Sequence, residues 1–160
     1  MDRRAFLAVT AGSSLLFTGF KFSDTITKSC LGLSDKVSDF AKRLKPIGRK
    51  LEAEGYYVWG TSPIIGPDGK IHVFFSRWPS KYGMGGWIHK SEIAHAVADT
   101  PEGEYQVIST VLAPRGDGFW DGTTCHNPHI KKVDGKYCLF YMGNSNRKTN
   151  TKRVGLAIAD

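Results

Sequence analysis

The feature that most constrains the fold of this 160-residue chain is an internal repeat. The segment SPIIGPDGKIHVFFS at residues 62–76 is echoed by NPHIKKVDGKYCLFY at residues 127–141, and HAVAD at 95–99 is echoed by LAIAD at 156–160. The first two segments lie 65 residues apart and the second two lie 61 apart, so the spacing is nearly constant while the loops vary. A repeat of this length predicts a solenoid, a propeller or an array of similar units.

Each copy of the repeat predicts a β-hairpin. Asp68-Gly69 and Asp134-Gly135 supply the positive φ angles of a tight turn, and β-branched or aromatic residues flank both turns. In the first copy, SEIAHAVAD predicts a third strand, TPEGEY a turn and YQVISTVL a fourth strand. Four antiparallel strands form one blade of a β-propeller, so we expect an all-β fold in which residues 56–160 make two blades.

The second copy reaches its third strand before the sequence ends at Asp160. A propeller closes with about four to eight blades, because an open ring leaves unpaired strand edges. We therefore expect the chain to be the N-terminal part of a longer protein. The alternative is a small two-sheet β domain that is complete at 160 residues.

The first 55 residues differ in kind from the repeat. Residues 1–22 place Arg3 and Arg4 before an apolar run from Ala5 to Phe20, which predicts an export signal of the twin-arginine type. The run is shorter than the roughly 20 residues that a bilayer requires, so we expect an exported protein, periplasmic or extracellular, without a stable membrane span. An uncleaved signal would instead anchor the protein to the membrane. Residues 23–55 predict a helical lead-in, with apolar residues at helical spacing: Val37, Phe40, Ala41 and Leu44.

The charge of the chain argues against one class of partner. The 22 Lys and Arg against 15 Asp and Glu give a net charge of +7, or about +5 without residues 1–22. The basic residues are scattered and form no stripe interleaved with aromatic residues, so we expect no nucleic acid partner. A mildly basic surface is compatible with an acidic polysaccharide.

Three cysteines, Cys30, Cys125 and Cys138, cannot all pair, and we expect no disulfide framework. Cys125 next to His126 leaves open a thiol nucleophile or a metal site. Because these residues lack the spacing of metal ligands, we expect no metal and no cofactor.

Three segments carry a resemblance to a known family: YYVWGTSPIIGPDGKIHVFFSRWP, SEIAHAVADTPEGEY and FWDGTTCHNPHIKKVDGKYCLFYMG. Together they resemble the opening blades of the five-bladed β-propeller glycoside hydrolases, the family 43-like group, over about residues 50–160. The resemblance implies a glycosidase that binds an oligo- or polysaccharide in a central pocket. It also implies three acting carboxylates: an Asp base on the first blade, an orienting Asp on the second and a Glu acid on the third.

The sequence departs from this pattern at both blades. Ser62 stands before Pro63 where the resemblance implies the first Asp, and His129 follows Pro128 where it implies the second. The nearest substitutes are Asp121 as a carboxylate and His126 as a base or orienting group, which we take as the candidate catalytic residues.

Six further residues are candidates for binding the sugar. In a regular strand, His126 and Pro128 would share one face and Asn127 and His129 the other, unless a bulge intervenes at Pro128. Tryptophans near turns can stack on a sugar ring, and an arginine can bind its carboxylate or hydroxyl groups. The candidate substrate-binding residues are Trp59, Ser62, Arg77, Trp78, Asn127 and His129.

Two classes of function remain. The first is a glycoside hydrolase that acts by carboxylate-assisted hydrolysis. The second is a propeller with other chemistry: either a polysaccharide lyase in which His and Tyr abstract a proton beside a uronate carboxyl, or a carbohydrate-binding propeller without turnover.

Overall fold

The computed structural model describes residues 37–160, so the predicted export signal and the first part of the lead-in lie outside the described residues. Residues 46–160 form a compact unit separate from the preceding chain. In that preceding chain, helix α3 (Asp39–Lys42) begins after Ser38, whose hydroxyl accepts a hydrogen bond from the Ala41 amide at 3.2 Å. Within residues 37–160, no helix has the length and apolar character needed to cross a membrane.

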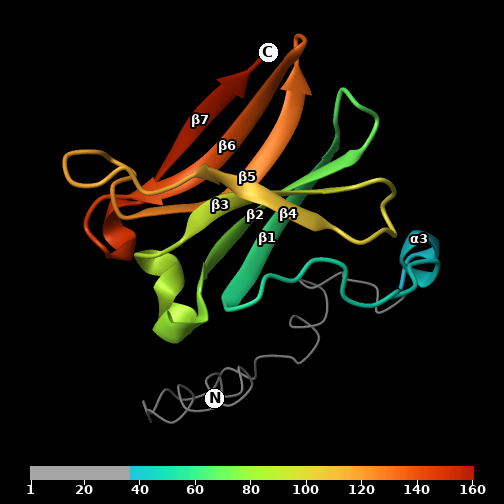
Figure 1. Cartoon of the computed structure of the whole chain (residues 1–160), viewed down its shortest axis with the longest axis horizontal. Helices are drawn as coiled ribbons and strands as arrows, with labels where there is room; N and C mark the ends of the chain where they lie inside the picture. The colour runs from blue at the N-terminus through green and yellow to red at the C-terminus, as the bar shows by residue number, and fades with distance from the viewer. Residues whose placement is uncertain (1–36) are drawn as a thin grey trace, which may run out of the picture. The chain divides into compact units, whose positions relative to one another are not determined.

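The compact unit consists of two antiparallel sheets (Figure 1). The first sheet has four strands and the second has three, and in both sheets neighbouring strands are consecutive in the chain. The first contains β1 (Tyr56–Ile65), β2 (Ile71–Pro79), β3 (Glu92–Ala98) and β4 (Gln106–Leu112), and the second contains β5 (Thr124–Val133), β6 (Lys136–Asn144) and β7 (Arg153–Ala159). Three short 3-10 helices lie in the connections: η1 (Ser80–Tyr82), η2 (Met84–Ile88) and η3 (Thr149–Thr151). The predicted all-β arrangement is confirmed.

Both sheets begin with a strand that carries a β-bulge at the same place. In β1 the register shifts by one residue between Trp59 and Ser62, and in β5 it shifts by one between His126 and His129. Each bulge contains a residue with a positive φ: Gly60 in β1, with a φ of 58°, and Asn127 in β5, with a φ of 50°. Bulges re-aim side chains and are often found beside active sites.

The bulges define which residues of the two repeats are equivalent. They match Trp59 with His126, Gly60 with Asn127 and Ser62 with His129. The match of Pro63 with Pro128, which the sequence favours, is therefore two residues out of register. The hairpin loops differ in length, since five residues join β1 to β2 and two join β5 to β6. An alignment of the two repeats on their Asp-Gly turns therefore shifts the preceding strands relative to each other.

Buried serines of the first sheet bind the backbone of β5. Ser62 accepts a hydrogen bond from the Ile130 amide at 3.0 Å, and Ser76 accepts one from the Asn127 amide at 2.8 Å. The Ser91 carbonyl, just before β3, accepts one from the Cys125 amide at 2.9 Å. Since β5 lies at the edge of its sheet, these bonds satisfy amides that have no partner strand there.

Apolar packing fills the space around these hydrogen bonds. One buried cluster joins Ile93 of the first sheet to residues of the second, and another lies within the first sheet. Trp120 packs closely on Gly143 of β6 and Gly155 of β7, where an added Cβ would approach its ring to 2.8 Å and 2.4 Å. The glycines therefore leave room for this indole on the face of the second sheet.

We predict that Ser76→Ala destabilises the protein by about 1–3 kcal/mol, because the Asn127 amide loses its acceptor in a partly buried position. Urea denaturation measures this change. Ser109→Ala is the control, since Ser109 lies exposed on β4 and its loss should change the free energy of unfolding by less than about 0.5 kcal/mol. Equal effects of the two substitutions would contradict the role given to Ser76.

Candidate functional site

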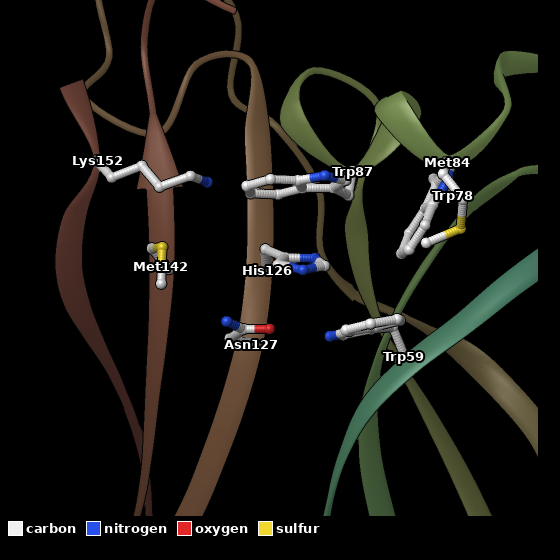
Figure 2. A pocket seen from close by; sticks show the side chains of 8 residues that line it. All are labelled: Trp59, Trp78, Met84, Trp87, His126, Asn127, Met142 and Lys152. Carbon is white, nitrogen blue, oxygen red and sulfur yellow. The ribbon is translucent and has the colours of Figure 1, made fainter. Parts of the chain in front are cut away.

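A cavity of about 360 Å³ opens where β5 approaches the first sheet. Residues of both sheets line it, as Figure 2 shows. The first sheet and the helix η2 contribute Trp59, Trp78, Met84 and Trp87, and the second sheet with its last loop contributes His126, Asn127, Met142 and Lys152.

Three indoles give the cavity an aromatic wall. Trp78 contacts the His126 ring edge-on and Trp87 contacts it at a tilt, with centroids 5.7 Å and 5.4 Å away. The position of Trp87 is fixed from the second sheet, because the Thr124 hydroxyl donates to its carbonyl at 2.9 Å. Trp59 is 51% exposed and extends from β1 toward Asn127 in Figure 2, so its face is accessible to a ligand.

His126 is the most enclosed polar side chain of the cavity, with 4% of its surface exposed. Burial between the indoles, together with the nearby Lys152 ammonium, lowers the pKa of His126 to about 4. The imidazole is therefore neutral at neutral pH. Its Nδ1 lies 2.9 Å from the Ser91 hydroxyl, so Nε2 is the ring nitrogen available to a ligand.

The bulge in β5 places a second polar group in the cavity. Asn127 directly follows His126, and both side chains line the cavity although neighbours in a regular strand would point apart. The bulge between His126 and His129, which spans Pro128, breaks the alternation of the strand. His129 does not line this cavity and is exposed.

Asp121 lies in the loop before β5 and does not line this cavity. Its carboxylate is buried and accepts hydrogen bonds from Arg115 Nε at 2.7 Å and from the Tyr141 hydroxyl at 2.8 Å. Burial, and then the bond to Asp121, raise the pKa of Tyr141 to about 12. Asp121 lines a separate hollow that extends to β7. The structure thus separates Asp121 from His126, and the carboxylate holds Arg115 and Tyr141 in place.

Two more predicted binding residues point away from the cavity. Successive residues of β2 face opposite sides, so Trp78 enters the cavity while Arg77 does not. Arg77 Nε donates to Glu92 at 2.7 Å, and its guanidinium also reaches Thr110 at 3.0 Å. Ser62 is buried and its hydroxyl is occupied by the Ile130 amide.

Cys125, next to His126, is not an activated thiol. Its side chain is buried, and desolvation raises its pKa to about 12, so the sulfur stays protonated. In the described part of the chain, no group of three or more His, Cys, Asp or Glu residues has the arrangement of a metal site.

Sequence reasoning did not select three residues of this cavity: Met84, Met142 and Lys152. Trp87 is one of the tryptophans near turns that could stack on a sugar, but residue type alone does not distinguish it from Trp120, which lies outside the cavity. Lys152 lies just after η3 in a basic loop. Nothing in its neighbours distinguishes it from the exposed lysines nearby, because only the folded loop brings it onto Trp87.

No family model and no curated protein match this sequence. Several solved structures match its fold. Zg3597, a family 117 glycoside hydrolase of the marine bacterium Zobellia galactanivorans, matches with a TM-score of 0.56 and 17% identity over 70% of this chain. The GH43_1 enzyme of Xanthomonas citri, solved with xylotriose, gives 0.55 and 18% over 71%. CoXyl43, a GH43 β-xylosidase/α-arabinofuranosidase from a compost metagenome, also solved with xylotriose, gives 0.54 and 21% over 72%.

These matches confirm the predicted likeness to the five-bladed propeller glycoside hydrolases at the level of the fold. The chain spans 38%, 32% and 36% of the length of the three neighbours. Their fold is thus shared over part of their length.

We predict that His126 makes the protein less stable in acid. The folded His126 titrates near pH 4, but in the unfolded chain it titrates near 6.5. Between these values the unfolded chain binds a proton that the folded protein does not, so the free energy of unfolding falls as the pH drops from 6.5 to 4. The loss should be on the order of 2 kcal/mol.

Urea denaturation between about pH 7 and pH 4 measures this loss. His126→Gln should remove this part of the pH dependence, whereas His129→Gln, at an exposed position, should keep it. Parallel pH profiles for the original protein and His126→Gln would show that His126 is not held neutral.

Proposed function

We propose that residues 46–160 form part of the sugar-binding pocket of a propeller glycoside hydrolase, and that its ligand is an oligo- or polysaccharide. The observation that carries this proposal is the cavity that Trp59, Trp78 and Trp87 line beside His126 and Asn127. The fold likeness to enzymes of families 43 and 117 supports it.

The chemistry of the cavity suits a sugar. A pyranose or furanose ring offers apolar C–H faces, which bind aromatic surfaces, and hydroxyl groups, which need hydrogen-bond partners. The half-exposed indole of Trp59 provides such a surface. Asn127 offers both a donor and an acceptor, and neutral His126 offers one ring nitrogen, so both can bind hydroxyl groups.

The role of His126 in this proposal is to orient the sugar. Hydrolysis of a glycosidic bond requires two carboxyl groups about 5–9.5 Å apart. Among the described residues, none of those lining this cavity is an Asp or a Glu. Asp121 keeps both of its oxygens engaged, with Arg115 and Tyr141. In this proposal the residues of the cavity bind the sugar, and the two carboxyl groups that hydrolysis needs come from other residues.

We expect Trp59→Ala to weaken saccharide binding about tenfold, since it removes the accessible stacking surface. Quenching of tryptophan fluorescence by xylotriose and by arabino-oligosaccharides measures the affinity. Phe119→Ala is the control, because Phe119 is an exposed aromatic residue that does not line the cavity. Equal affinities of Trp59→Ala and the original protein would contradict the proposal.

Hydrolysis is tested separately from binding. The protein is incubated with a panel of oligosaccharides, and the release of reducing ends is measured together with the absorbance of unsaturated products. Reducing ends without such absorbance support a hydrolase. Unsaturated products would instead support the lyase alternative.

A further inference from the structure

Lys152 is an unusual member of the cavity. Its Nζ atom is buried, and in residues 37–160 it is the one buried side-chain nitrogen or oxygen that lacks a hydrogen-bond partner. The nitrogen lies 4.4 Å from the centre of the Trp87 ring. Figure 2 shows the side chain extending from the loop after η3 across the cavity toward Trp87.

This arrangement leaves a positive charge poorly compensated. A buried ammonium loses its water shell, and the attraction of an indole face replaces only part of that interaction. Desolvation accordingly lowers the pKa of Lys152. Folded proteins almost always pair a buried lysine with an acid, so an unpaired one that costs stability is typical of a functional site.

The other residues around Lys152 offer no counter-charge. The cavity contains three indoles and the thioethers of Met84 and Met142, which are apolar. Its polar members besides Lys152 are Asn127, which is uncharged, and His126, which is neutral at neutral pH. The charge of Lys152 therefore gives the cavity a positive potential that favours an anionic ligand.

We propose that the ligand of this cavity is an acidic saccharide whose carboxylate or sulfate group pairs with Lys152 Nζ. This inference rests on the proposed function, since it specifies which saccharide the pocket takes. Trp59 binds the apolar face of the sugar, Asn127 and His126 bind hydroxyl groups, and Lys152 binds the anion. A charge-assisted hydrogen bond of this kind is stronger than one between neutral groups.

The test compares three oligosaccharides of equal length: a neutral one, a uronate-containing one and a sulfated one. Affinity is measured by tryptophan fluorescence for the original protein and three variants. Lys152→Met removes the charge and keeps the bulk, Lys152→Arg keeps the charge, and Lys148→Met is the control because Lys148 is an exposed lysine of the same loop.

We expect at least one acidic oligosaccharide to bind about tenfold or more tightly than the neutral one. Lys152→Met should abolish this preference, whereas Lys152→Arg and Lys148→Met should keep it. A preference for the uronate identifies a carboxylate as the anion, and a preference for the sulfated sugar identifies a sulfate ester. Equal affinities for neutral and acidic sugars would overturn the inference and leave the proposed function standing. Absence of binding by all three sugars would overturn both.

Thermal unfolding separates a binding role of Lys152 from a structural one. If Lys152 serves the ligand, Lys152→Met removes a buried unpaired charge, and the melting temperature stays the same or rises. An acidic oligosaccharide should raise the melting temperature of the original protein and not that of Lys152→Met. A fall in melting temperature for Lys152→Met, without loss of the preference for acidic sugars, would show that the lysine is structural.

Discussion

The packing of the two sheets depends on how the edge of β5 satisfies its backbone amides. No strand of the described chain pairs with this edge, and hydroxyl groups from the first sheet replace the missing ladder. Ser62 and Ser76 are small enough to sit between the sheets without opening a gap. Because each of their bonds crosses from one repeat to the other, the sheets are fixed in register as well as held together.

The bulges in β1 and β5 determine which side chains of these strands line the cavity between the sheets. Each adds a residue to an inner strand, and in β5 it brings Asn127 to the same side as His126. The backbone N–H of Asn127 donates to the Ser76 hydroxyl. This hydrogen bond between the sheets therefore also fixes the part of the cavity wall that Asn127 forms. Gly60 lies opposite, where a Cβ would approach the Asn127 side-chain oxygen to 3.3 Å. This close approach and the positive φ of Gly60 both favour a residue without a side chain at this position.

The sequence contained enough to predict the sheets and part of the site. Alternating residues and Asp-Gly turns specify the hairpins locally, and the repeat specifies their number. Residue type, and a place near a turn or on the inner strand, predict four members of the cavity: Trp59, Trp78, His126 and Asn127. The same signals favour Arg77 and Asp121, but these side chains bind Glu92 and Arg115, which come from other strands and loops. Such contacts between distant parts of the chain depend on the fold and cannot be read from neighbouring residues. The contact of Lys152 with the Trp87 ring is of the same kind.

The bulges make Trp59 and His126 equivalent positions of the two repeats, yet the side chains there have different chemistry. One repeat thus provides a flat apolar surface, and the other provides an imidazole with a hydrogen-bonding nitrogen. A pair of identical repeats would give a pocket with pseudo-symmetric walls, in which a chain molecule could lie in either direction. Here the two walls differ, so a ligand with two unlike ends makes different contacts in its two orientations.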